Sequence, residues 1–352
     1  MSVNLLESNN IFSIKNYPKA FDYWNIHEKA HWLFDEVPLT DDMIDFWNAD
    51  KREKDFLENI LRLFTQNDIE VGDGYDILLR IFKPLEIKMM LRGFSSREVT
   101  HIMAYSHFTE TIGFDDNFYS EFKEIPQMNC KVEYLEKCKV RKYEFYEEEY
   151  KRLELDSNVE DYIKIRYKQD TLRMLGAYAT GTEGISLFAQ FAMLLKYQTI
   201  NKYKGLANIV EWSIRDEEIH VQGNSFLFRE FVKENPEILT DEVKKDIYGS
   251  IRQIVRFECD LIDYLNPPHL SKEDCKDYVK YIANERLKLI GFKPNWEIKK
   301  NPFNFMEELN NSLSLTNFFE GKVTEYTKNS LVGNWEHFRN NENFIRQYSR
   351  QI

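Results

Sequence analysis

The sequence predicts an all-helical protein, a four-helix bundle with a dinuclear metal site in its core. Three observations support this prediction. Strand-type alternation of polar and apolar residues is scarce, and only 9 Pro and 13 Gly interrupt the 352 residues. Long stretches carry apolar side chains at helical spacing. Two copies of the pattern Glu-x-x-His lie in such stretches, each with an acid about one helix upstream.

The chain divides into three parts by composition. Residues 1–37 are rich in aromatic residues and Asn, and we expect an irregular segment there. Residues 38–309 have the helical pattern of a metal-binding domain. Residues 310–352 are polar and Asn-rich with few aliphatic side chains, so we expect a flexible C-terminal tail.

Apolar periodicity and breaker residues outline the helices of the domain. One stripe consists of Phe56, Ile60, Leu63 and Phe64 and leads to Asp68. We expect Gly113 and Pro236 each to end a helix. The most apolar segment spans residues 176–202. We expect helices over residues 41–47, 50–71, 85–112, 130–155, 158–175, 176–202, 206–233, 240–265 and 271–290.

The two Glu-x-x-His pairs are the predicted centre of the site. A step of three residues turns a helix by about 300°, so each glutamate shares a helix face with its histidine. The order of acid, pair, acid, pair is the ligand pattern of a carboxylate-bridged dinuclear centre in a four-helix bundle. The predicted metal ligands are Asp68, Glu98, His101, Glu183, Glu217 and His220.

This ligand set suits particular metals. Four carboxylates balance two divalent cations, and the oxidised pair needs only an oxygen-derived bridge to stay near neutral. Carboxylate oxygens with one imidazole per metal favour iron, with manganese as the other candidate. None of the four cysteines lies near the predicted ligands or forms a metal-binding motif.

An isolated Glu-x-x-His is a weak signal, since a solvated helix face is the commoner origin. A third copy, Glu28 to His31, is interpreted as chance because no preceding helix supplies an acid. The duplicated spacing and the apolar surroundings favour the other two pairs. Glu183 is a single acid in the most apolar segment, where an unpaired carboxylate is costly.

Three further residues are candidates for roles around the metal pair. Tyr105 follows His101 by four residues and shares its face, so it is either an oxidisable phenol beside the metals or a core tyrosine. Asp216 precedes His220 by four residues and either accepts the free ring N–H of a ligand histidine or belongs to a solvated charge run. Trp32, by itself, is a core tryptophan.

Composition excludes several classes of function. The net charge of −12, without a dense basic run, argues against a nucleic-acid partner. No uncharged apolar run reaches about 18 residues, which argues against a membrane span. The cysteine pattern and the lack of a signal peptide predict reduced thiols in a cytoplasmic protein.

Several segments together resemble the small, radical-generating (beta) subunit of class I ribonucleotide reductase, in the compact form found in bacteria and their viruses. The resemblance covers about residues 20–338. The segments that carry it are Phe64-Thr65-Gln66-Asn67-Asp68, Arg97-Glu98-Val99-Thr100-His101-Ile102-Met103-Ala104-Tyr105, Gly181-Thr182-Glu183-Gly184, Ile214-Arg215-Asp216-Glu217-Glu218-Ile219-His220 and Thr316-Asn317-Phe318-Phe319-Glu320.

The resemblance implies a ferritin-like homodimer that works with a separate large (alpha) subunit in ribonucleotide reduction for DNA synthesis. It implies that the metal pair reacts with oxygen to produce a tyrosyl radical, at Tyr105 in this chain. It also implies that Trp32 and Asp216 start radical transfer to the large subunit. Tyr326 in the tail matches the tyrosine that continues the transfer, with Tyr348 as the second candidate, and the tail is the expected docking element.

Two other functions are compatible with part of this pattern. A related di-metal ligand-binding oxidase acting on a small molecule or lipid would share the ligands but would need neither the radical tyrosine nor the tail. The other is iron storage or a purely structural bundle, but ferritin-like storage chains are about half this length and leave no role for a long polar tail. The sequence leaves open iron against manganese, an activating flavoprotein, the preference for nucleoside di- or triphosphates, and the role of the unmatched extension 339–352.

Overall fold

The computed structural model describes residues 4–7, 16–114, 116–134 and 161–308. The chain forms two units, Met1–Phe303 and Asn304–Ile352, and the site lies in the first. All regular secondary structure in the described residues is helical, which confirms the predicted fold class. The boundary expected between 309 and 310 stays a prediction.

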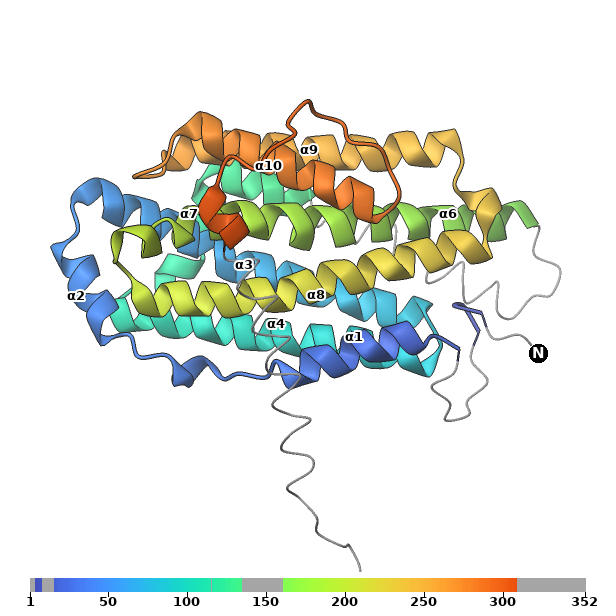
Figure 1. Ribbon diagram of the computed structural model, residues 1–352, viewed down its shortest axis with the longest axis horizontal. Coiled ribbons are helices and arrows are strands. Elements are labelled where there is room, and N and C mark those ends of the chain that lie inside the picture. Colours follow the sequence, from blue (N-terminus) through green and yellow to red (C-terminus); the bar gives the residue numbers. More distant parts are fainter. Residues whose placement is uncertain (1–3, 8–15, 115, 135–160, 309–352) are drawn as a thin grey trace, which may run out of the picture. The chain divides into compact units, whose positions relative to one another are not determined.

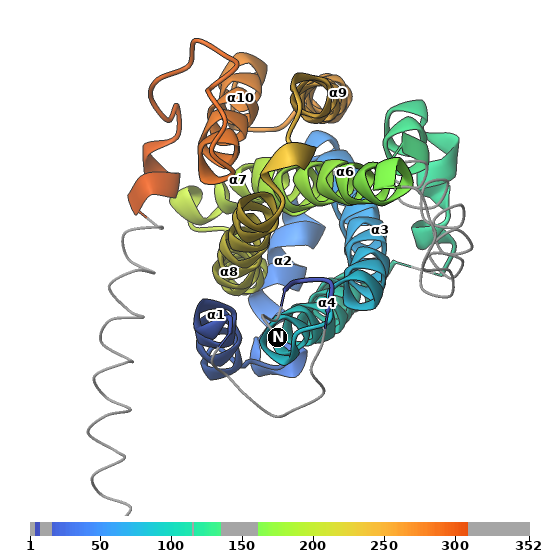
Figure 2. The same cartoon turned by 90° about the vertical axis from the view of Figure 1, so that its right-hand side faces the viewer.

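Four helical runs enclose the core of the first unit, as the end-on view in Figure 2 shows. The fourth run is composite, because a π-helix (η4) joins two α-helices. The runs are α3 (Lys51–Ile81), α4 (Leu85–Ile112), α8 (Lys204–Glu234), and α6 (Asp161–Ala177) with η4 (Tyr178–Leu187) and α7 (Phe188–Leu195).

The remaining elements cover this core (Figure 1). Helix α1 packs against α4 and α8, whereas α9 and α10 pack on each other and on η4. These elements are α1 (Pro18–Lys29), η1 (Phe34–Glu36), α2 (Thr40–Asn48), η2 (Asp116–Tyr119), η3 (Glu121–Glu124), a helix over 126–134, η5 (Gln198–Ile200), η6 (Pro236–Ile238), α9 (Asp241–Leu265) and α10 (Lys272–Leu289).

Most helices expected in the described residues are confirmed. Those expected at 85–112, 206–233, 240–265 and 271–290 match α4, α8, α9 and α10 to within two residues. The segment 176–202 is helical only in part, since it is divided among η4, α7 and η5. Most of the helix expected at 130–155 lies outside the described residues.

The prediction of an irregular segment over 1–37 is wrong for Pro18–Lys29, which form α1. Proline in the first turn fixes the backbone angle that a helix needs and gives up only an N–H that would have no partner there. Close packing on α4 then stabilises the helix. A Cβ placed on Gly93 would lie 3.0 Å from Cδ1 of Trp24, so the glycine allows α1 to approach.

The π-helix η4 carries Glu183 and is held in place by α10. Arg286 donates from Nε to the carbonyl of Gly184 at 3.1 Å and pairs through Nη2 with Glu218 of α8 at 2.9 Å. Its guanidinium also lies 4.4 Å from the ring centroid of Phe188. These contacts tie η4, α8 and α10 together, and Glu183 is fully buried.

The start of α8 is fixed by a residue from another helix. The residue before α8, Tyr203, has a positive φ of 50° and provides no side-chain cap. Instead the carboxylate of Asp42 in α2 accepts the backbone N–H groups of Gly205 at 2.9 Å and Leu206 at 2.8 Å. This cap satisfies amides that would otherwise have no partner, and it sets the register of α8, which carries Glu217 and His220.

We expect Gly205→Ala to destabilise the fold. The new Cβ would lie 2.7 Å from the carbonyl oxygen of Pro38 and 2.8 Å from Oδ2 of Asp42, so backbone must move. Overpacking of this kind costs about 1–3 kcal/mol. Gly249→Ala is the control, because a Cβ there meets nothing within 4 Å and should be neutral or stabilise α9. Free energies of unfolding from urea titration test this, and equal values for the two variants would contradict it.

Candidate metal centre

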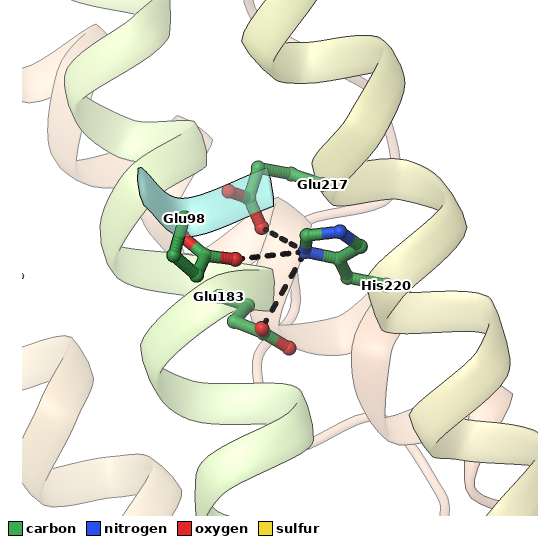
Figure 3. Close-up of side chains that lie close together, drawn as sticks. All are labelled: Glu98, Glu183, Glu217 and His220. Atoms are coloured by element: carbon green, nitrogen blue, oxygen red, sulfur yellow. Dashed lines mark ion pairs between the residues drawn. The ribbon is translucent and has the colours of Figure 1, made fainter. Parts of the chain in front are cut away.

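Four of the predicted ligands meet in the middle of the bundle. Glu98, Glu183, Glu217 and His220 each offer a donor atom within 4.8 Å of the others. Figure 3 shows the three carboxylates turned toward one ring nitrogen of the histidine. That nitrogen, Nδ1 of His220, lies 3.1 Å from Glu98, 3.2 Å from Glu217 and 3.6 Å from Glu183.

His101 joins the cluster from the opposite side of the shared carboxylates. Its Nδ1 lies 3.1 Å from Oε1 of Glu217 and 3.5 Å from Oε2 of Glu98. The centroids of the His101 and His220 rings are 6.4 Å apart. Glu98 and Glu217 therefore each contact both histidines, whereas Glu183 contacts only His220. The arrangement has two halves that share two carboxylates.

Asp68 belongs to the half that contains His101. Its side chain is 1% exposed on α3. Burial raises the pKa of Asp68 well above its usual value, while the His101 ring lowers it and the carboxylates of Glu98 and Glu217 raise it further. Of the two histidines, His101 is the one that acts on Asp68, which associates Asp68 with the His101 half.

The buried carboxylates and histidines shift one another's pKa values. Burial raises the pKa of Glu183 from 4.5 to about 7. Burial would lower the pKa of His101 and of His220, but the carboxylates around them raise both well above 6.5. Burial would likewise raise the pKa of Glu217, which the two histidines instead lower.

The donor set fits a pair of metal ions. Oδ2 of Asp68 is buried without a hydrogen-bond partner in the described residues. The buried carboxylates of Glu98 and Glu217 face the Nδ1 atoms of His101 and His220. Unpaired buried carboxylates are costly, and cations between them would remove that cost. Four hard carboxylates and two imidazoles facing inward through Nδ1 are a donor set that iron and manganese accept.

Beyond the cluster, His101 is linked to Trp32. Nε1 of Trp32 donates to Oδ2 of Asp216 at 2.7 Å, and Nε2 of His101 lies 3.3 Å from the same oxygen. Nη1 of Arg97 lies 3.5 Å from this oxygen as well. Burial would raise the pKa of Asp216, but His101 and Arg97 lower it to about 2, so the group is a carboxylate.

Asp216 thus meets the histidine of the neighbouring helix α4. In the sequence, Asp216 lies one helical turn from His220, and the spacing does not determine which ligand histidine donates to it. His220 directs its Nε2 to another residue, His27 of α1, whose Nε2 is 3.0 Å away. Burial lowers the pKa of His27 to about 2, and its ring is neutral.

Tyr105 lies beside the cluster, fully inside the bundle. Its side chain is 1% exposed, and its ring centroid is 4.7 Å from that of Phe64. Its hydroxyl donates to Oγ of Ser213 at 3.1 Å, and Ser213 donates in turn to the carbonyl of Ile209 at 2.9 Å. Burial, with the carboxylate of Asp68 as the next cause, raises the pKa of Tyr105 well above its usual value.

Three acidic or histidine residues that the sequence analysis excluded from the site lie outside the cluster, and two tyrosines that it proposed cannot be placed. Glu28 and His31 are exposed, in agreement with the interpretation of that pair as chance. Glu218 pairs with Arg286 and does not join the cluster. Tyr326 and Tyr348 lie outside the described residues.

The chain matches the family model for the small chain of ribonucleotide reductase over residues 8–302. It belongs to this family. Over 342 residues it is 34% identical to a probable ribonucleoside-diphosphate reductase small subunit of Invertebrate iridescent virus 3, with 95% of this chain and 88% of the relative covered. It is 28% identical to the beta subunit from Chlamydia pneumoniae, with 93% and 92% covered.

Solved structures agree on the fold. The R2 subunit from Clostridium botulinum superposes with a TM-score of 0.74 at 20% identity, covering 87% of this chain and 94% of that one. The small chain described here is therefore an oxidoreductase subunit with the predicted ferritin-like fold, and membership implies a large-subunit partner and a dimer. Among the described residues, no helix has the length and apolar character needed to cross a membrane.

Sequence reasoning missed four residues of this small chain that surround the cluster. Tyr75 donates its hydroxyl hydrogen to Oε1 of Glu183, and Nδ2 of Asn224 donates to Oε2 of Glu183 at 2.8 Å. Asn224 follows His220 by four residues, a spacing that could have indicated it. Arg97 precedes His101 by four residues and could have been found in the same way. His27 carried no such signal.

We expect the affinity of the metal-free small chain for Mn²⁺ to rise between about pH 6 and about pH 8, because metal must displace the protons of the cluster. Glu183 keeps its proton in the folded chain up to pH about 7, against 4.5 for its ordinary pKa. Because the pKa of Glu183 is higher in the folded chain than in the unfolded chain, its proton stabilises the folded state. This contribution is complete below pH 4.5 and is lost as the pH rises through about 7.

Calorimetric titration in buffers of different ionisation enthalpy would count the protons released on Mn²⁺ binding. Glu183→Gln is the matched variant, since it cannot titrate and should release fewer protons. Affinity that does not change with pH over this range, or proton release that is the same in both proteins, would contradict the prediction.

Proposed function

We propose that the cluster binds two metal ions per chain, iron or manganese, as the radical-generating centre of the reductase. The contacts support a division of the ligands. Asp68 and His101 would hold one ion, and Glu183 and His220 the other. Glu98 and Glu217 would bridge the two, because each lies within reach of both Nδ1 atoms. This sharing of two carboxylates is the observation that carries the proposal.

Tyr105 is the proposed site of the radical. A bound redox-active metal pair would supply the oxidising power for chemistry with oxygen. Tyr105 would then lose an electron together with its hydroxyl proton, since burial disfavours a charged phenolate. The hydroxyl hydrogen is directed to Oγ of Ser213, so the proton would leave the phenol on that side. Phe64 packs on the phenol ring and excludes water from it.

Trp32 and Asp216 are the proposed start of transfer to the large subunit. The hydrogen bond of Trp32 ends on the oxygen that His101 contacts, so the three side chains form one continuous route away from the centre. Trp32 also stacks on His101 at a centroid distance of 5.9 Å. Asp216 can accept the indole proton when Trp32 is oxidised. Trp212 packs on Trp32 at 5.3 Å and extends the aromatic contact.

The tail of residues 310–352 is the proposed docking element for the large subunit. Its composition supports this proposal, since separated aromatic residues in a polar segment can order on a partner. Within it, Tyr326 is the proposed relay to the large subunit. The names of the sequence relatives favour a reductase over the di-metal oxidase and over a storage bundle.

We expect Tyr105→Phe to bind two metals per chain but to give no stable tyrosyl signal after the reduced protein meets oxygen. Phenylalanine keeps the packing on Phe64 and removes the hydroxyl. Metal analysis with electron paramagnetic resonance measures both properties. Tyr278→Phe, a buried tyrosine of α10, is the control and should keep the signal. A signal unchanged in Tyr105→Phe would move the radical to another tyrosine, of which Tyr75 is the first candidate.

Asp216→Asn should keep both metals and the radical but lower turnover with the large subunit by at least about tenfold. Asparagine keeps the shape of the side chain but replaces the charge that accepts from Trp32 and faces His101. Glu230→Gln on the same helix is the control, because Glu230 pairs with Lys233 near the end of α8, away from the cluster. Turnover equal to that of the control would remove Asp216 from the route.

Tyr326→Phe should bind the large subunit normally and yet be inactive in turnover. The variant removes a single hydroxyl and leaves the length and aromatic character of the tail unchanged. Pull-down with the large subunit and a nucleotide-reduction assay separate binding from transfer. Normal turnover in Tyr326→Phe together with loss in Tyr348→Phe would place the relay in residues 339–352.

A further inference from the structure

One histidine outside the six ligand positions reaches the cluster. His27 lies near the end of α1, and its Nε2 is 3.0 Å from Nε2 of His220. The two ring centroids are 5.0 Å apart. Figure 3 shows that the second ring nitrogen of His220 lies on the side of the ring away from the carboxylates, and this is the nitrogen that His27 meets.

The contact determines where the ring hydrogens lie. A metal bound at Nδ1 of His220 needs the lone pair of that atom, so the ring hydrogen must be on Nε2. Two nitrogens at 3.0 Å need one donor and one acceptor. His220 is then the donor and His27 the acceptor, and the hydrogen of His27 lies on its own Nδ1.

His27 is held against His220 by packing and by its backbone, while its Nδ1 is buried without a hydrogen-bond partner in the described residues. Its side chain is 1% exposed, and its ring packs on Phe94 at 5.3 Å, which packs on His220 at 4.4 Å. Its carbonyl oxygen accepts from Nη2 of Arg97 at 3.3 Å. A Cβ placed on Gly93 would lie 3.6 Å from Nδ1 of His27, so α4 closes the other side of the ring.

The two ligand histidines therefore have different partners. Nε2 of His101 faces the carboxylate of Asp216 at 3.3 Å, whereas Nε2 of His220 faces a neutral imidazole at 3.0 Å. A carboxylate attracts the ring hydrogen on Nε2 more strongly than a neutral imidazole does. Nδ1 of the same ring then becomes a stronger electron-pair donor to a metal. A neutral imidazole keeps the same tautomer with a weaker effect.

We propose that His27 is a positioning residue that fixes the ligating tautomer of His220 and makes the two metal positions unequal. The position at His101 fills first, and the position at His220 depends on the acceptor that His27 provides. This proposal rests on the proposed ligand set. It adds a residue from α1, which supplies none of those ligands.

The test uses Mn²⁺ alone, titrated without oxygen into the metal-free full-length chain. The wild type should bind two ions with unequal affinities. His27→Leu removes the acceptor and should weaken the weaker site by at least about tenfold, whereas His27→Gln keeps a carbonyl acceptor and should remain within about threefold of the wild type. His31→Leu, an exposed neighbour in sequence, is the control and should match the wild type.

Anomalous scattering from Mn²⁺ in crystals grown at limiting metal assigns the sites. Occupancy at the His220 position should fall in His27→Leu, while occupancy at the His101 position stays at the wild-type level. The unfolding temperature of each metal-free variant checks its fold. His27→Phe keeps a ring against Phe94 without an acceptor, and it serves if the leucine variant does not fold.

Three results would overturn the role of His27. These are unchanged Mn²⁺ binding in the leucine or phenylalanine variant, equal weakening in the leucine and glutamine variants, and loss confined to the His101 position. Equal weakening would show that packing alone matters. A wild type that binds no Mn²⁺ would count against the proposed metal centre itself, so the two failures can be told apart.

Discussion

Four carboxylates and two imidazoles lie buried together in the middle of the bundle, and the rest of the fold is built around that electrostatic cost. Each group is contributed by a helical run, and all six residues are at most 1% exposed, so none of the charges faces solvent. Repulsion among the acids raises the pKa of Glu183 and of Asp68, on top of the effect of burial. Such a cluster is tolerable only if protons or cations occupy it.

The contacts around the cluster restrict how its members can move. Arg97 and Arg215 both donate to the carbonyl oxygen of Ala30, just after α1, which joins that turn to α4 and α8. Trp32 follows two residues later, so the same contacts hold its indole against Asp216. Asn224 and Tyr75 restrain Glu183 from the opposite side. These contacts restrain the orientation of the donor side chains independently of any bound ion.

The parts of this centre that the sequence predicted are those encoded locally. Glu98 with His101 and Glu217 with His220 are one helical step apart, so their shared face follows from helix geometry alone. Asp68 and Glu183 could be recognised because each is an acid in an apolar stretch. The helices α4, α8, α9 and α10 have clear periodicity and clear breakers, and their bounds were predicted to within two residues.

The parts that were missed depend on contacts between distant segments. His27 meets His220 across 193 residues and Tyr75 meets Glu183 across 108, separations at which spacing carries no information. Helix α1 was missed for a related reason, since it depends on close packing at Gly93 more than on its own pattern. The π-helix likewise has no sequence signature, because contacts from α10 hold it.

That π-helix has a consequence for comparing this chain with its relatives. Each hydrogen-bonded turn of a π-helix contains one residue more than an α-helical turn. The segment Tyr178–Leu187 therefore contains more residues than an α-helix of the same length along its axis. A relative with a plain α-helix at this place would align only with a gap close to Glu183. Without that gap, Glu183 would be aligned with a residue one position away in the relative. That residue would lie about 100° away around the helix axis and would not face the site.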